Sequence, residues 1–139
     1  MSLFKVFDVA GSAMNAQSVR LNVTASNLAN AGSVSGDPDK VYRAKQPVFA
    51  TFNDALVAQT GVSGVRLTGV TESTAPLNVQ YRPDHPDADA DGNVYVSNVS
   101  TVEEMVNMMS ASRSYQNNVE MINTTRDLLL QTLALGRQG

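Results

Sequence analysis

Cysteine is absent from the 139 residues, and histidine occurs only once, at position 85. Without a thiol, the chain can form no disulfide, no thiolate zinc site and no cysteine nucleophile. A single imidazole is also too few for the histidine clusters that hold most catalytic metals. The sequence contains neither a glycine-rich phosphate-binding loop nor a G-x-S-x-G nucleophile motif. We therefore predict a protein that is not an enzyme and needs no cofactor.

Charge is also scarce, at 17% of residues against the roughly 25% that is usual for globular domains. The 13 acidic and 10 basic residues give a net charge of -3, which argues against a nucleic-acid partner. No stretch approaches the about 20 apolar residues of a membrane span, so we expect no membrane insertion. Lys5 and Asp8 interrupt the apolar start of the chain, so we also expect no cleaved signal peptide.

The scarce charges and the helix-breaking residues are unevenly distributed. Residues 1–31 carry only Lys5, Asp8 and Arg20, and residues 99–135 contain neither glycine nor proline. All five prolines lie between residues 32 and 98. This pattern predicts an N-terminal helix over 1–31, a loop and small β-rich middle domain over 32–98, and a long C-terminal helix within 99–139. The fold class is α+β, mainly α, with the two terminal helices packed together like a coiled coil.

Apolar side chains in the first helix recur at steps of three and four residues, the heptad spacing of a seam between helices. Small side chains alternate with the large ones along this seam, which would let another backbone approach closely. The large positions are Phe4, Phe7, Met14, Leu21 and Leu28, and the small ones are Gly11, Ser18 and Ala25. We expect the helix to end near residues 30–32, where Asn or Gly can cap it.

The last helix is predicted to start at Ser100 or Thr101, each of which has a glutamate three residues later, and to stop at Gly136. Its seam again follows steps of three and four. The predicted packing positions are Met105, Met108, Tyr115, Val119, Ile122, Leu129 and Leu133.

Two interpretations of these helices are possible: a helix pair within one monomer, or helices that neighbouring chains also cover. The segment 127–135 distinguishes them, because its apolar residues are spread around the helix rather than along one stripe. A helix that is apolar all round must be surrounded. Burial by copies or by sister chains is therefore the better account.

The middle segment contains four short runs that are typical of strands, at residues 41–52, 65–68, 77–81 and 93–96. Pro47 makes the first of these an edge or interrupted strand. Residues 32–40 are rich in Ser, Gly, Asp and Pro and are predicted to form a mobile loop.

Asp87, Asp89 and Asp91, followed by Gly92, match the opening D-x-D-x-D-G of a calcium-binding loop. The match is weak, because Asn98 occupies the position where such a loop carries a bidentate glutamate. A solvated acidic turn is the simpler interpretation, with Asp91-Gly92 as the turning pair. For His85 a local role in the loop is favoured over general acid–base chemistry.

Several blocks resemble one protein family. Asn27, Leu28, Ala29 and Asn30 match the A-N-L-A-N signature near the N-terminus of bacterial flagellar axial proteins. Residues 42–49, 85–95 and 104–119 are similar to blocks of the rod subunits of this family, and the last block is the most specific. Over essentially its whole length, the chain resembles a rod subunit of the flagellar rod and hook axial family.

The resemblance implies a structural subunit of the proximal rod of the flagellar basal body. Such a subunit would polymerise through its terminal helices and help to form the torque-transmitting drive shaft. Its partners would be copies of itself, other rod proteins, the flagellar export apparatus and possible basal-body ring components. It would be exported by the type III route and assemble in the periplasm. The alternatives are another rod or hook-family axial subunit and, from a different class, a secreted calcium-binding module.

Overall fold

The computed structural model describes residues 3–52 and 63–136, which form two long helices with five short strands between them. The elements are α1 (Leu3–Asn30), β1 (Val34–Ser35), β2 (Lys45–Phe52), β3 (Gly64–Glu72), β4 (Asn78–Tyr81), β5 (Asn93–Val96) and α2 (Thr101–Gly136). The predicted fold class is therefore confirmed.

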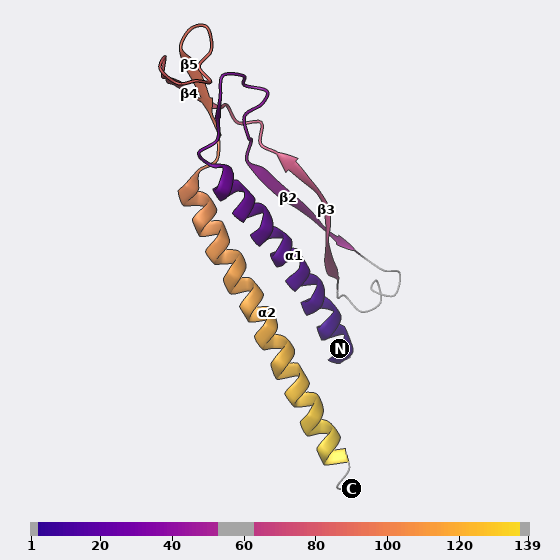
Figure 1. Cartoon of the computed structure of the whole chain (residues 1–139). Helices are drawn as coiled ribbons and strands as arrows, with labels where there is room; N and C mark the ends of the chain where they lie inside the picture. Colours follow the sequence, from indigo (N-terminus) through magenta and orange to yellow (C-terminus); the bar gives the residue numbers. More distant parts are fainter. Residues whose placement is uncertain (1–2, 53–62, 137–139) are drawn as a thin grey trace.

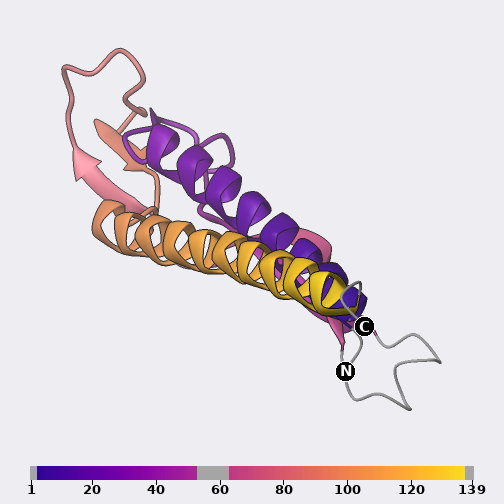
Figure 2. The same cartoon turned by 90° about the horizontal axis from the view of Figure 1, so that it is seen from below.

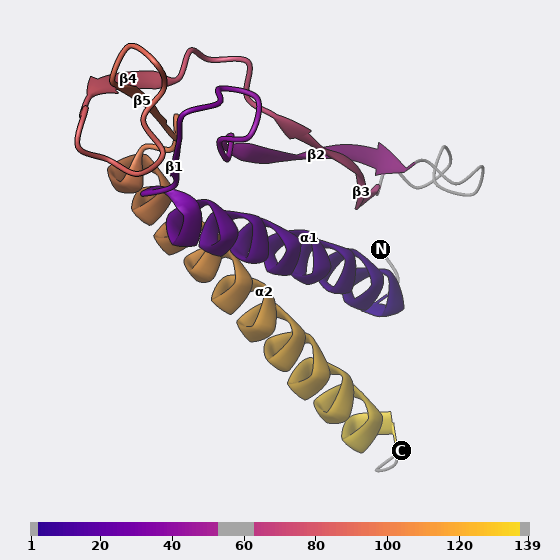
Figure 3. The same cartoon turned by 45° about the horizontal axis from the view of Figure 1, so that its top comes forward.

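The two helices are antiparallel and lie side by side, as Figure 1 and the view from below in Figure 2 show. The β2–β3 ribbon packs on another side of α1. The small sheet of β1, β5 and β4 lies beyond the end of the helix pair where α1 stops and α2 begins (Figure 3). The first helix is thus the central element, with α2 on one side and the ribbon on another.

Polar residues mark the helix boundaries that meet below the small sheet. The Ser100 hydroxyl accepts a hydrogen bond from the backbone N–H of Glu103 at 3.4 Å, as an N-cap does at the start of α2. Glu103 and Glu104 in the first turn add favourable charge at the positive end of the helix dipole. At the end of α1, the Asn30 amide donates to the Ser26 carbonyl at 2.8 Å. Both boundaries lie where the sequence predicts them.

β2 and β3 form a two-stranded antiparallel ribbon whose register runs from Lys45 opposite Glu72 to Phe52 opposite Gly64. The register shifts between Val48 and Phe49, where β3 contains one extra residue and forms a bulge. Pro47 is accommodated because a strand of a two-stranded ribbon has a free edge. The prediction of an edge strand around Pro47 is confirmed, although the strand begins at Lys45 rather than at residue 41.

The prediction of a mobile loop over residues 32–40 is wrong in part, because Val34 and Ser35 form β1. Val34 pairs with Val96 of β5, and the Ser97 N–H donates to the Ser33 carbonyl at 3.0 Å. A two-residue strand is too short to produce any alternation in the sequence. Its pairing depends on β5, which lies some sixty residues further along the chain.

Residues 37–40 close this segment as a polar turn. The Asp37 carboxylate accepts a hydrogen bond from the Asp39 N–H at 3.0 Å. It also forms an ion pair with the Lys40 ammonium group at 3.2 Å. These two interactions, the backbone hydrogen bond being the larger, hold the pKa of Asp37 below its ordinary value.

The connection between β4 and β5 contains the acidic run and returns through Gly92, whose φ of 77° lies in the left-handed region. This connection packs closely on the β1 segment at Gly36. A side chain at position 36 would collide with the backbone carbonyl of Asp87. The small sheet therefore depends on a close approach between two loops.

The apolar core of a single chain is small. Among the described residues the buried hydrophobic side chains are three alanines and two valines, namely Ala10, Ala16, Val41, Val94 and Ala111. Polar side chains account for much of the remaining buried set, which comprises Thr24, Asn27, Ser97 and Thr125. Large apolar side chains are instead found on the surface of α2 and of both sheets.

We predict that Gly36→Ala separates the β1 segment from the acidic loop, because the new methyl group cannot fit against the Asp87 carbonyl. Limited trypsin digestion should then cleave after Lys40 several-fold faster than in the natural chain. Gly69→Ala is the matched control, because an added Cβ at that position meets nothing within 4 Å. Equal cleavage rates in all three chains would contradict this account of the small sheet.

Candidate interaction surface

The side chain of Asn27 fastens the ribbon to α1. It is 1% exposed, and its Oδ1 accepts hydrogen bonds from the Lys45 N–H at 2.9 Å and the Tyr42 hydroxyl at 2.9 Å. Its Nδ2 donates to the Lys45 carbonyl at 2.8 Å. The amide thus pairs with both backbone groups of Lys45, as a neighbouring strand would. This pairing fixes the start of β2 against the last turns of α1.

A second asparagine, Asn98, binds the backbone of Ala44, which directly precedes Lys45. The Asn98 Oδ1 accepts from the Ala44 N–H at 2.8 Å, and its Nδ2 donates to the Ala75 carbonyl at 3.0 Å. At the far end of the ribbon, the Ser12 hydroxyl accepts from the Val65 N–H at 3.3 Å. Hydrogen bonds, rather than a filled apolar layer, therefore dock the ribbon on α1.

The predicted seam positions of α1 differ in how far they are buried within the single chain. Its large members Phe7, Met14, Leu21 and Leu28 are half-buried, whereas its small members Gly11, Ser18 and Ala25 are exposed. The side chain of Phe4 lies outside the described residues. The fully buried side of α1 is instead occupied by Ala10, Ala16, Thr24 and Asn27.

The predicted seam of α2 is similarly divided. The side chains of Met108, Tyr115, Val119, Ile122 and Leu129 are half-buried around the buried Ala111 and Thr125. The other two predicted positions, Met105 and Leu133, are 57% and 58% exposed. Packing of either seam against another subunit stays a prediction.

The exposed side of α1 forms a continuous uncharged surface, which we call the outer face. It follows steps of three and four along the helix and contains only small or amide side chains. Its members are Gly11, Asn15, Ser18, Asn22, Ala25 and Ala29.

Large apolar side chains on α2 gather in two exposed groups. The methionine ridge covers the first turns of the helix and comprises Val102, Met105, Val106 and Met109. The leucine tip lies at the other end of the helix and comprises Leu128, Leu130, Leu133 and Leu135. Exposed apolar groups of this size are typical of surfaces that bind other proteins.

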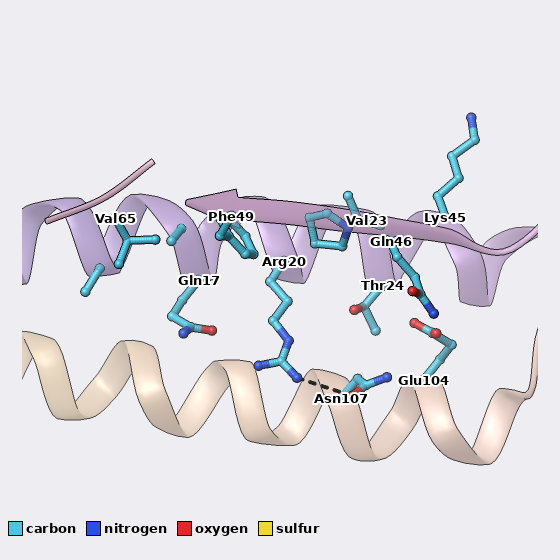
Figure 4. Close-up of a pocket in the computed structure, with 13 residues that line it drawn as sticks. Gln17, Arg20, Val23, Thr24, Lys45, Gln46, Phe49, Val65, Glu104 and Asn107 are labelled. Atoms are coloured by element: carbon cyan, nitrogen blue, oxygen red, sulfur yellow. Dashed lines mark hydrogen bonds between the residues drawn. The ribbon is translucent and has the colours of Figure 1, made fainter. Parts of the chain in front are cut away.

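A cleft of about 440 Å³ lies between α1, β2 and the first turns of α2 (Figure 4). The Arg20 guanidinium crosses it and donates to the Asn107 side chain at 3.3 Å. Lys45 points out of the cleft, with its ammonium group 5.3 Å from the Tyr42 ring centre and 4.0 Å from Glu72. The cleft is thus bridged by one polar contact between the two helices.

The lining of this cleft offers little for catalysis. Among the described residues that form it there is no histidine, cysteine or serine, and its charged members are Arg20, Lys45 and Glu104. The Gln17 Oε1 is buried there without a hydrogen-bond partner in the described part of the chain.

The three aspartates of the calcium-like motif are not brought together around a common point. In residues 3–52 and 63–136 the acidic and histidine side chains form no group of three that could hold a metal ion. The Asp89 carboxylate instead accepts from the backbone N–H groups of Asp91 at 3.0 Å and Asn93 at 2.7 Å. It thereby stabilises the turn, and the calcium-binding alternative is not favoured.

His85 has a local role in the same loop. Its Nδ1 accepts a hydrogen bond from the Asp87 N–H at 3.1 Å. It lines an open depression together with Tyr81, Arg82, Pro83 and their neighbours. In the described part of the chain no helix is long and apolar enough to cross a membrane.

Sequence reasoning did not find the structural role of Asn27, which it had identified only as part of a family signature. It also did not single out Tyr42 or Asn98 as partners in the docking of the ribbon. An asparagine in the interior of a helix is a weak signal, because most such residues face solvent. Only the position of Lys45 in space shows what the Asn27 amide does.

Two family models match parts of the chain. The model described as "Flagella basal body rod protein" matches residues 7–36, and "Flagellar basal body rod FlgEFG protein C-terminal" matches residues 90–135. These segments contain most of α1 and nearly all of α2.

Full-length relatives are also similar to the chain. A flagellar basal-body rod protein FlgC from Escherichia coli O6:H1 is 56% identical over 137 residues, which cover 99% of this chain and all of the relative. FlgC proteins from Salmonella typhimurium and Yersinia enterocolitica are 54% and 52% identical, with the same coverage.

We predict that Asn27→Ala releases β2 from α1, because it leaves both backbone groups of Lys45 without their partner. Such a loss costs about 1–3 kcal/mol, which raises the equilibrium constant for local opening roughly 5- to 150-fold. Hydrogen–deuterium exchange at the Lys45 amide measures this local opening. The experiment is done at a protein concentration at which circular dichroism shows α1 to be helical. Asn22→Ala on the outer face is the control and should leave this exchange rate unchanged.

Proposed function

The chain belongs to the FlgC family of flagellar basal-body rod proteins and is a structural subunit of the rod; on this premise, we propose that its two terminal helices polymerise with those of neighbouring subunits. The supporting observation is the contrast between a minimal core and an apolar surface. Five small or medium hydrophobic side chains are buried in the described residues, while fourteen large ones are at least 41% exposed. A stable fold requires that much of this exposed surface be covered.

The free energy available from such covering is large relative to the stability of a small domain. Full burial of one leucine side chain stabilises by about 1.5–3 kcal/mol. The leucine tip and the methionine ridge together hold eight apolar side chains that are half-exposed or more. Even partial burial of these groups exceeds what the five buried side chains of the single chain supply.

The outer face of α1 and the apolar groups of α2 are different surfaces, so contacts between subunits would be heterologous. A heterologous contact repeated along a screw axis produces a helical tube rather than a closed oligomer. Close packing of many such helices resists shear, because a packed interior deforms little. A tube of this kind would transmit torque as a drive shaft.

We also propose partners for the subunit, and a location more specific than the flagellar basal body. The partners are copies of this chain, other rod proteins, the export apparatus and components of the basal-body rings. The location is the periplasmic rod, reached by type III export without a cleaved signal. We further propose that the subunit catalyses no reaction, since the described lining of its cleft contains no histidine, cysteine or serine.

Deletion of the gene, followed by complementation, tests the proposed function. We expect loss of swimming and absence of complete rods in purified basal bodies, with both restored by the natural chain. A complementing copy that carries Leu133→Gln and Leu135→Gln is expected to restore few rods, because polar side chains weaken the apolar contacts. Val79→Gln, which changes an equally exposed residue of β4, is the control. Normal rods in the deletion strain would overturn the proposal.

A second prediction concerns the free subunit. Long helices with so little burial within one chain are marginal in water, so we expect the terminal segments to be largely unfolded before assembly. Circular dichroism of the dilute purified chain should therefore show far less helix than the 28 and 36 residues of α1 and α2. A stable monomer with full helix content would contradict this expectation.

A further inference from the structure

The second helix runs past the end of the first. α2 contains 36 residues and α1 contains 28, a difference of about 12 Å at 1.5 Å per residue. Figures 1 and 3 show the C-terminal part of α2 extending beyond the start of α1, with no other described element beside it. This overhanging part carries the leucine tip.

The overhang continues the surface that α2 already uses against α1. The stripe that packs on α1 passes through the buried Ala111 and Thr125 and the half-buried Ile122. At the same steps of three and four it reaches Leu129, which is half-buried, and then Leu133, which is 58% exposed. The helix–helix interface of the single chain therefore continues onto a stretch of α2 where α1 has ended.

The tip is apolar on more than this one stripe. Leu128, Leu130 and Leu135 are 50%, 52% and 73% exposed and lie at other angles around the helix. No charged residue occurs between Leu128 and Gly136. A surface that fits the tip must therefore be long, uncharged and able to approach a helix closely.

The chain itself presents a surface with these properties on the outer face of α1. It is exposed, uncharged and spaced for helix packing. Gly11 supports this use, because a Cβ at that position would meet nothing within 4 Å in the described part of the same chain. A glycine inside a helix costs about 1 kcal/mol relative to alanine. Since no contact within residues 3–52 and 63–136 requires Gly11, its missing side chain is best explained by the close approach of another chain.

We propose that the leucine tip of one subunit docks on the outer face of α1 of a second copy of this chain. The inference rests on the proposed function and specifies which surfaces meet. It extends the α1–α2 interface from within one subunit to the contact between two subunits. The leucines fill the space that the glycine, serine and alanine side chains of the outer face leave free.

The same contact cannot form within one chain. Arg20 of α1 is level with Asn107 of α2, since their side chains are hydrogen-bonded. Leu133 therefore lies about 36 Å along the helix axis from the level of Ser18. Two residues can be joined by a disulfide only when their Cα atoms lie within about 7 Å. A disulfide between these positions must connect different molecules.

The natural absence of cysteine makes a direct test possible, because every thiol can be placed by design. Leu133→Cys is combined in turn with Gly11→Cys, Ser18→Cys or Ala25→Cys in the complementing copy, and a parallel set uses Leu135→Cys. Strains that still swim are treated with a mild oxidant, and purified basal bodies are analysed on non-reducing gels. The control pairs each outer-face cysteine with Val79→Cys on the exposed face of β4.

We expect at least one pair of the tip sets to give a ladder at multiples of the 14.8 kDa chain that disappears on reduction. The Val79 pairs and the single-cysteine chains should give none. Linkage to a protein of another mass, or no linkage from any pair in swimming strains, would overturn the docking of a second copy. Either result leaves the rod assignment standing, because that depends on the deletion phenotype. If no strain of a set swims, the purified chain carrying the same cysteines is concentrated and oxidised instead. Absence of a ladder in that experiment counts against the proposal.

Discussion

The side-chain amide of Asn27 is the interaction on which the arrangement of the subunit depends. It replaces a missing strand neighbour for Lys45 and so ties the ribbon to α1 with three short hydrogen bonds. Because the residues that the structure describes include five buried hydrophobic side chains, the apolar contribution to this docking is small. A buried amide with every group paired defines one geometry, because any displacement leaves polar groups unsatisfied. The orientation of the ribbon relative to the helix pair is therefore set by directional bonds, while apolar surface is left for other contacts.

Stabilisation by hydrogen bonds and stabilisation by apolar burial therefore involve different parts of the molecule. Polar contacts of Asn27, Asn98 and Ser12 hold the ribbon and the small sheet to the helices within one chain. Large apolar side chains are exposed on the first turns and at the end of α2 and on both sheets. Apolar contacts are tolerant of small shifts, whereas hydrogen bonds are not. In a subunit built in this way, polar contacts define the geometry, while the large apolar surface stays available for contacts with other subunits.

The sequence predicts the helices well because each extends over several turns and carries its own caps and periodicity. Ser100, Asn30 and Gly136 are local signals, and the structure places the helix ends at or beside them. β1 could not be predicted, since its two residues acquire their conformation from Val96 and Tyr95 of β5. The seam illustrates a different limit. Heptad spacing indicates that Gly11 and Leu133 face a helix, but it does not specify whether that helix belongs to the same chain. Burial in the structure answers this for Ala111 and Thr125, which face a helix of the same chain, but it does not assign a partner to the exposed positions.

The scarcity of charge follows from the same arrangement. A side chain that is exposed in the free subunit and buried after assembly must be compatible with both environments. Lysine or glutamate on the outer face would be solvated well in water but would resist burial, because desolvating a charge is far more costly than desolvating an amide or a hydroxyl. The 13 serines, 10 threonines and 12 asparagines of the chain supply groups that tolerate either state. Uncharged contacts are also not weakened by Debye screening, since screening acts on charges. A low proportion of charge is thus the composition expected of a chain whose helices are surface at one stage and interior at the next.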